Sequence, residues 1–206
     1  MPEREGNRKP FQLTGSGSPE RADAARNRAK ILAAAASVYA ERGVDGLALD
    51  QVAAVAGVGV GTVYRRFADR GQLAQGLMDA HEQAFQASFM TGPPPLGPGA
   101  PAGDRLRAFL HAFVDRLSTQ ADLLVVAETA TPTARYESGA YRLHHVHVVA
   151  LLDELRPGAD THYLADALLA QVAAAQFVRQ HRDEGLSVER IKSGLDDLLT
   201  ALTRVP

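Results

Sequence analysis

The sequence predicts an all-α protein whose N-terminal part carries a helix-turn-helix. Apolar residues recur at spacings of three and four from about residue 22 onward, and strand-like alternation appears nowhere. A short apolar-periodic helix stops at Gly57, and a second one begins within three residues and runs into Tyr64, Arg65, Arg66 and Phe67. Two helices joined by such a tight, Gly-containing turn form a helix-turn-helix, whose second helix enters the major groove of DNA.

The composition is that of an ordinary folded protein, with 46% hydrophobic and 22% charged residues. Cysteine is absent, which excludes disulfides, thiol catalysis and thiolate metal sites. No apolar run is long enough for a membrane span and the N-terminus lacks a secretory signal, so we expect a cytoplasmic protein without membrane contact. The net charge of −2 is low for a DNA-binding protein. Arg65, Arg66 and Arg70 nevertheless cluster beside the second helix, and local patches decide phosphate contact.

The chain divides into four parts by composition and helical periodicity. Residues 1–20 mix Pro, Gly, Ser and charges, which predicts a disordered tail that is either a spacer or a basic arm on DNA. Residues 21–90 form the helix-turn-helix domain with its connecting helix. Five prolines lie between residues 93 and 101, so residues 91–103 are interpreted as a linker or exposed loop. Residues 104–206 form a larger helical domain.

Local signals place most helix ends. Gly43 and Gly57 follow the last periodic residues of two helices, and Asp69 with Gln72 has the form of a capping box. The stretch from Val146 to Leu152 is apolar nearly all round, which predicts a buried central helix. The expected helices are 22–42, about 49–56, 60–67, 70–90, 104–119, 121–129, 134–155, 161–183 and 188–203.

The N-terminal helices carry a combination of residues at defined spacings. Over roughly residues 22–85 these are Ile31, Leu32, Tyr39–Gly43, Val52, Ala53, Ala56–Val58, Gly61–Phe67 and Leu73. Together with the larger helical domain that follows, this combination resembles the TetR family of bacterial transcription regulators. The resemblance implies a DNA-binding domain followed by a ligand-binding and dimerisation domain.

The resemblance also implies a recognition helix at about Val60–Arg66. Gly61, Thr62 and Tyr64 occupy positions that usually meet DNA, Arg65 and Arg66 point outward, and Arg70 replaces a common lysine that holds a phosphate. The alternatives are a structural aromatic residue at Tyr64 and an ordinary solvated face at the two arginines.

Three residues depart from the family pattern. Ala48 replaces a threonine that caps the second helix and bonds a phosphate, and alanine can do neither. Gly59 and Val60 replace the usual serine and lysine at the turn. We therefore expect the C-terminal half of the helix-turn-helix to carry most of the DNA contacts.

The second domain is expected to bind an apolar or amphipathic small molecule. His144 and His147 share a helical face and could hold a metal, but no carboxylate partner stands at ligand spacing, so we expect neither metal nor cofactor. The candidate lining residues, each of which could equally belong to the core, are Phe109, Phe113, Tyr136, Tyr141, His144, His147, Gln176 and Phe177.

These observations favour a homodimer that assembles through about residues 161–203 and acts as a ligand-responsive repressor on double-stranded DNA. An activator of the same fold and a DNA-binding protein without an effector remain alternatives. No nucleophile–base pair, phosphate loop or metal motif is present, so we do not expect an enzyme.

Overall fold

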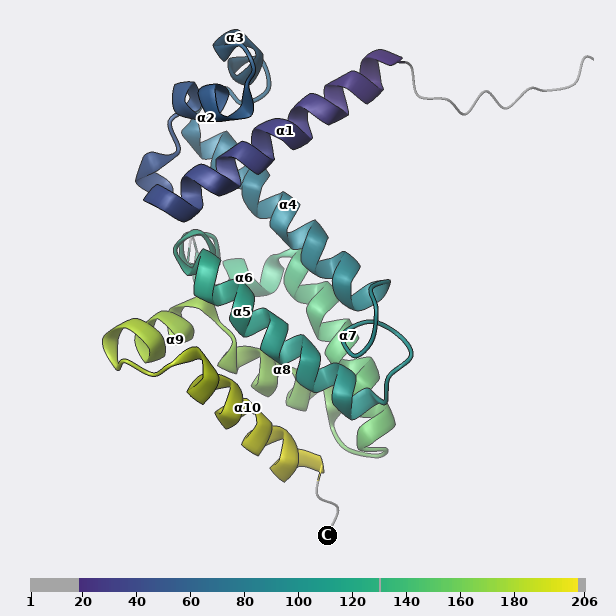
Figure 1. The fold of residues 1–206 in the computed structure, drawn as a ribbon. Coiled ribbons are helices and arrows are strands. Elements are labelled where there is room, and N and C mark those ends of the chain that lie inside the picture. Colours follow the sequence, from purple (N-terminus) through teal and green to yellow (C-terminus); the bar gives the residue numbers. More distant parts are fainter. Residues whose placement is uncertain (1–18, 130, 204–206) are drawn as a thin grey trace, which may run out of the picture.

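The computed structural model describes residues 19–129 and 131–203 (Figure 1). Every regular element in these two ranges is helical, as predicted. The predicted tail lies outside the described residues, except that Pro19 and Glu20 already belong to the first helix.

The N-terminal unit consists of a long helix, a short helical turn and two short helices. The elements are α1 (Pro19–Arg42), the 3₁₀ turn η1 (Val44–Gly46), α2 (Leu49–Ala56) and α3 (Val60–Tyr64). The next helix, α4 (Arg70–Met90), runs from this unit down into the larger one (Figure 1). Helix α3 ends three residues earlier than expected, so Arg65 and Arg66 follow it in a turn.

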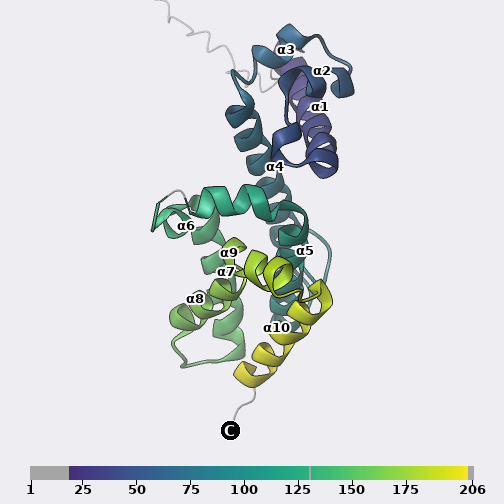
Figure 2. The ribbon, with the colours of Figure 1, turned by 90° about the vertical axis from the view of Figure 1, so that its left-hand side faces the viewer.

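The larger unit packs the remaining helices around one core. They are α5 (Ala102–Glu128), α6 (Ala134–Glu137), α7 (Gly139–Leu155), α8 (Thr161–Gln171), α9 (Ala174–Val178), the π-helical turn η2 (Arg179–Asp183) and α10 (Val188–Thr203). Figure 2 shows the end of α5 that leads to α6 lying directly beneath the N-terminal helices.

Four of the expected helices of the larger unit have different bounds. The predicted helices 104–119 and 121–129 are one helix, because no Gly or Pro separates them and Ala121 is buried in the core. The predicted helix 134–155 breaks at Ser138, whose backbone is extended and whose hydroxyl accepts from the Tyr141 amide at 3.0 Å. The predicted helix 161–183 breaks at Ala173, because the backbone there is extended.

Two separate hydrophobic cores hold the chain together, and α4 contributes to both. Leu73 and Leu77, in its first half, are buried in the N-terminal core. Phe85 and Phe89, in its second half, are buried in the core of the larger unit. The N-terminal core also includes Leu123 from α5, which is 4% exposed. The predicted boundary at residues 90 and 91 is therefore not where the two cores divide.

The structure also gives the surroundings of α7 and of the Pro-rich stretch, which is a mostly exposed loop. Val146 on α7 is 63% exposed, so this helix is not buried all round; its outer face is open to solvent. The Pro-rich stretch after α4 is a folded loop in which the Gly97 amide donates to the Pro93 carbonyl at 2.9 Å. Leu96 from this loop packs against the core of the larger unit.

Candidate functional site

The helix-turn-helix is held by backbone geometry at Gly57. This residue has a φ of +63°, a left-handed conformation that glycine adopts without steric cost. Its amide donates to the Ala54 carbonyl at 3.3 Å, and the Val58 amide donates to the Ala53 carbonyl at 3.1 Å. These two bonds form a Schellman motif, which ends α2 and sends the chain into α3.

Helix α3 and the turn that follows have a buried inner face and an exposed outer face. Val63 and Phe67 are almost completely buried, which fixes the inner face. Tyr64 is 51% exposed, and Gly61, Arg65 and Arg66 are exposed beside it. Thus the predicted DNA-contacting side chains lie on the outer face.

One side-chain hydrogen bond orders this outer face. The Arg65 guanidinium donates to the hydroxyl of half-buried Thr62 at 3.2 Å. Together with Arg66 and with Asp23 and Asn27 of α1, these residues line an open hollow of about 460 Å³. The hollow joins the outer face of α3 to the first turns of α1.

Arg70 lies at the first position of α4, apart from that hollow. Its guanidinium is 3.5 Å from the carboxylate of Asp45, and both side chains are largely exposed. Such an exposed pair is weak and can exchange for a phosphate. Asp69 before it caps α4 by accepting from the Gln72 amide at 2.8 Å, while the Gln72 side chain accepts from the Ala68 amide.

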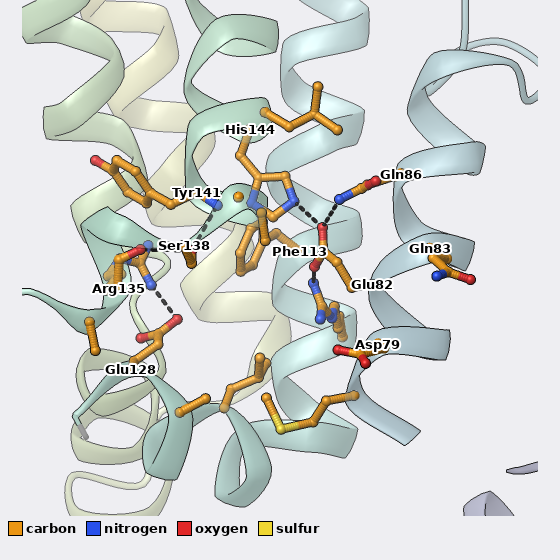
Figure 3. Close-up of a pocket in the computed structure, with 18 of the residues that line it drawn as sticks. Asp79, Glu82, Gln83, Gln86, Phe113, Glu128, Arg135, Ser138, Tyr141 and His144 are labelled. Atoms are coloured by element: carbon orange, nitrogen blue, oxygen red, sulfur yellow. Dashed lines mark hydrogen bonds and ion pairs between the residues drawn. The ribbon is translucent and has the colours of Figure 1, made fainter. Parts of the chain in front are cut away.

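A cavity of about 620 Å³ lies in the larger unit between α4, the second half of α5, α6 and the start of α7 (Figure 3). Exposed residues of α4 form its mouth. It is lined by Gln75, Met78, Asp79, Glu82, Gln83, Gln86, Phe113, Arg116, Leu124, Ala127, Glu128, Ala134, Arg135, Ser138, Gly139, Ala140, Tyr141, Leu143 and His144.

Glu82 is the centre of a buried polar cluster on one wall. Its carboxylate forms an ion pair with Arg116 and accepts from the Gln86 amide at 2.7 Å. Nε2 of His144 lies 2.9 Å from the same carboxylate. That contact lacks hydrogen-bonding alignment, and the buried ring nitrogen has no hydrogen-bond partner among the described residues. Burial would raise the pKa of Glu82, but His144 and the Arg116 guanidinium lower it to about 2.

A second buried pair, Glu128 with Arg135, stands on the opposite wall. Glu128 also accepts from the Ala174 amide at 2.9 Å, and Arg135 donates to the Leu169 carbonyl at 2.8 Å. The guanidinium lies 5.3 Å from the ring centroid of Tyr141. These contacts join the cavity wall to α8 and α9.

The tyrosine that faces this pair is held by a hydrogen bond of its own. The Tyr141 hydroxyl donates to the Asp166 carboxylate at 2.7 Å. Burial and that carboxylate both raise the pKa of Tyr141, so the phenol stays protonated at neutral pH. Its ring, rather than its hydroxyl, faces the cavity.

The structure brings three of the eight predicted ligand-contacting residues to the cavity: Phe113, Tyr141 and His144. The other five do not line it. Phe109 and Phe177 are buried in the core, where aromatic area is used for packing. Tyr136 is 56% exposed beside Tyr141, and Gln176 bonds to Arg179.

His147 lies behind the cavity rather than in it. Its ring is 4.5 Å from that of Phe89 and 5.1 Å from that of Phe109, between ring centroids. Its Nε2 atom is buried and has no hydrogen-bond partner in the described part of the chain. Burial, with the nearby charges of Arg105 and His144, lowers the pKa of His147 to about 4.

The sequence did not indicate the charged residues of the wall, Glu82, Arg116, Glu128 and Arg135. A faint signal exists on α4, where Gln75, Asp79, Glu82 and Gln86 follow one another at helical spacings of four, three and four. Such a polar stripe on a helix that packs at both ends indicates a hydrated or ligand-binding face. The partner of His144 was also missed, because Glu82 lies 62 residues earlier in the chain.

The described residues contain neither a membrane-spanning helix nor a cluster of metal ligands. None of the described helices combines the length and hydropathy that crossing a membrane requires. Over residues 19–129 and 131–203, no three His, Asp or Glu side chains gather closely enough to hold a metal ion.

Comparison with known proteins identifies the N-terminal unit. Residues 31–77 match the family model described as bacterial regulatory proteins, tetR family. No protein of curated function matches the chain.

Several solved structures share the fold over most of the chain. A putative TetR-family transcriptional regulator from Rhodococcus sp. is 22% identical, covers 87% of this chain and 100% of its own, and has a TM-score of 0.65. A TetR-family regulator from Pectobacterium atrosepticum is 20% identical, with coverages of 90% and 98% and a TM-score of 0.67. A putative transcriptional regulator from Saccharomonospora viridis in complex with choline is 17% identical, with coverages of 85% and 96% and a TM-score of 0.67.

Proposed function

The chain belongs to the TetR family of transcriptional regulators, and from this premise we propose that it is a homodimeric repressor released from its operator by a small molecule. The observation that carries the proposal is the cavity of about 620 Å³ between two helices that both reach the core of the DNA-binding unit. DNA-binding regulation follows from the family. Repression, effector response and dimerisation are the proposed parts.

The outer face of α3 supports contact with the major groove. Tyr64, Arg65 and Arg66 are exposed there, and the inner face is buried through Val63 and Phe67. Arginine side chains bind guanine edges or phosphates, and a tyrosine hydroxyl readily binds phosphate. In a symmetric dimer, two such faces about 34–36 Å apart meet successive major grooves, so the operator is nearly palindromic.

Exposed apolar and small residues on α8 and α10 support dimerisation. Tyr163 is 71% exposed on α8, where Ala167 and Ala170 are exposed as well. Leu198 is 43% exposed on α10, one turn from exposed Gly194. Small residues let helices approach closely, and a symmetric interface buries the same patch on both subunits.

The cavity is placed to couple effector binding to DNA binding. On one side, Met78 and Glu82 of α4 line it, while Leu73 and Leu77 of the same helix are buried in the N-terminal core. On the other side, Leu124 of α5 lines it, and the adjacent Leu123 is buried in that same core. A molecule that changes the spacing of these two helices therefore shifts the DNA-binding unit.

A ligand moves this equilibrium only by the difference between its affinities for the two conformations. An effector that fits better when the helices are apart favours a dimer whose recognition helices no longer match successive grooves. The choline bound to the Saccharomonospora viridis regulator supports a small-molecule effector within the same fold.

DNA recognition is tested by selecting binding sites for the full chain from random double-stranded DNA. The selected sequences should contain a near-palindrome. Tyr64→Ala and Arg65→Ala should each weaken binding at least about tenfold in a gel-shift assay without lowering the melting temperature. Arg142→Ala, an exposed arginine on α7 outside the helix-turn-helix and the proposed dimer helices, is the matched control. Unchanged affinity in both helix-turn-helix variants would refute the assignment of the DNA-binding face.

The coupling is tested at Leu123, with fluorescence anisotropy of a labelled operator as the readout. Leu123→Met preserves volume, so the protein should remain folded while the contact with the DNA-binding core changes. We expect an altered ratio of DNA affinities with and without effector. Leu110→Met, at a fully buried position earlier on the same helix, should leave that ratio unchanged.

The sign of regulation is tested with a reporter gene behind the selected operator. A repressor lowers reporter output, and the effector restores it. Output that rises with the protein would instead establish an activator of the same fold. Full DNA affinity in the presence of every compound that fills the cavity would favour a DNA-binding protein without an effector.

A further inference from the structure

Three carboxylates and two guanidinium groups line the cavity. The carboxylates are those of Asp79, Glu82 and Glu128, the guanidinium groups are those of Arg116 and Arg135, and His144 is the remaining basic residue of the wall. We propose that the effector is an organic cation, an amine in its protonated or quaternary form attached to an apolar body. This inference rests on the proposed function, because it names the chemistry of the effector for that same cavity.

The Arg116 guanidinium is buried and already has partners within the protein. It pairs with Glu82, donates to the Gln120 side chain at 3.3 Å and lies 5.5 Å from the ring centroid of Phe85. Its side chain is only 7% exposed. An anionic ligand at this point would have to displace the Glu82 carboxylate from a buried pair, which leaves that charge uncompensated.

The second guanidinium, that of Arg135, is engaged in the same way. It pairs with Glu128, donates to the Leu169 carbonyl and covers one face of the Tyr141 ring. Its side chain is 10% exposed. Both guanidinium groups of the wall are therefore buried and paired with a carboxylate of the protein, which disfavours a carboxylate or phosphate ligand.

Asp79 is the one acid of the wall that no basic group of the described chain neutralises. Its carboxylate accepts only from the Gln75 amide, at 2.9 Å, and its side chain is exposed at the mouth. Glu82 stands three residues further along α4, so both carboxylates lie on one helix face about one turn apart (Figure 3). A cation that enters the cavity passes Asp79 and reaches Glu82.

His144 is a second buried polar group of this wall. The residue is 4% exposed and lines the cavity, and its Nε2 atom lies 2.9 Å from the Glu82 carboxylate without an aligned hydrogen bond within the described ranges. Native proteins rarely leave such a buried polar atom without an aligned bond. A ligand N–H group placed beside this pair would donate to the Glu82 carboxylate.

The remaining wall suits the apolar part of such a molecule. Phe113 and Tyr141 present aromatic rings to the cavity, and a cation near an aromatic face gains further stabilisation. Leu124, Met78 and Leu143 add aliphatic surface. The volume of about 620 Å³ is within the range of pockets that enclose drug-sized ligands. Thus the sequence-based expectation of an apolar or amphipathic effector is narrowed to an amphipathic cation.

The test compares probes that share one aromatic body and differ in charge. Phenethylamine, phenethyltrimethylammonium, phenethyl alcohol and phenylacetate are titrated into the full chain by isothermal titration calorimetry. Both cations should bind at least about tenfold more tightly than the alcohol, and phenylacetate should bind most weakly. The two cations separate charge from hydrogen bonding, because only phenethylamine can donate to the Glu82 carboxylate.

Asp79→Asn provides the matched variant, because its exposed, unpaired carboxylate can be removed without breaking an ion pair. It should weaken binding of both cations about fivefold to tenfold and leave the alcohol unchanged. Asp104→Asn, which removes an acid outside the cavity, should change none of the four affinities. Phenylacetate binding as tightly as the amines, failure of every probe to bind, or identical affinities in Asp79→Asn and the unaltered chain would each overturn the proposal.

Release of a labelled operator distinguishes this proposal from the proposed function. Release by phenethyl alcohol or phenylacetate but not by the amines would overturn the cationic effector and keep a ligand-responsive regulator. Tight, Asp79-dependent binding of amines without any release would keep the cation site and overturn the effector role.

Discussion

Replacing His147 by leucine should remove a specific acid sensitivity of folding. Burial holds the pKa of this histidine at about 4 in the folded protein, against 6.5 for the ordinary side chain. Between these two values the unfolded chain binds a proton that the folded chain does not. The contribution of neutral His147 to the free energy of unfolding is therefore complete above pH 6.5, and it is lost progressively as the pH falls toward 4. From pH 6.5 to 5 the loss amounts to about 2 kcal/mol at most, because each pKa unit corresponds to roughly 1.4 kcal/mol.

Urea denaturation of the full chain at pH 6.5 and at pH 5 measures this effect. The difference between the two unfolding free energies should be smaller in His147→Leu than in the unaltered protein by about 1–2 kcal/mol, since partial exposure reduces the full value. Other titrating groups contribute equally to both proteins and cancel. The substitution His162→Leu, at an exposed histidine, serves as control. Equal pH dependence in all three proteins would refute the assignment of a neutral, buried His147.

Three substitutions test packing, capping and the buried ion pair. Gly76→Ala should destabilise the protein by about 1–3 kcal/mol in urea denaturation, because its Cβ would come within 2.8 Å of an aromatic carbon. Gly103→Ala, whose Cβ would come no closer than 3.6 Å to its nearest neighbour, a Leu155 methyl carbon, should instead stabilise α5 by up to about 1 kcal/mol; equal effects at the two positions would contradict the packing. Ala48→Ser should raise the melting temperature through about 1 kcal/mol of capping at α2, which now has no side-chain cap, and no rise would argue against that N-cap geometry. Glu82→Gln should cost about 3–5 kcal/mol because it leaves a buried guanidinium unpaired, and adding Arg116→Met should restore much of the loss; a double variant no more stable than the single one would contradict the pair.

Residues close together in the sequence were predicted best. The Schellman motif at Gly57 and the cap at Asp69 are formed by neighbouring residues, so glycine and acid positions sufficed to place them. The family resemblance then located the recognition helix. Its end was overestimated because Phe67 continues the apolar period, although the backbone leaves the helix at Arg65.

Contacts between distant residues could not be predicted in the same way. Glu82, Arg116 and His144 come from three helices, and their cluster depends on how α4, α5 and α7 cross. Aromatic residues were predicted to contact the ligand, but Phe109 and Phe177 fill the core. Burial of an apolar ring stabilises a protein core as well as a complex with a ligand. The sequence alone offers no means to separate these two uses of an aromatic ring.

The division of α4 between two cores has a consequence for how the protein unfolds. Melting of the N-terminal core would expose Leu73 and Leu77 and free the first half of the helix. The second half of α4, which places Phe85 and Phe89 in the core of the larger unit, would then lose the support of the first half. Because one uninterrupted helix serves both cores, we expect a single cooperative transition by calorimetry rather than two. A substitution that weakens the larger unit should therefore reduce the population of folded helix-turn-helix as well.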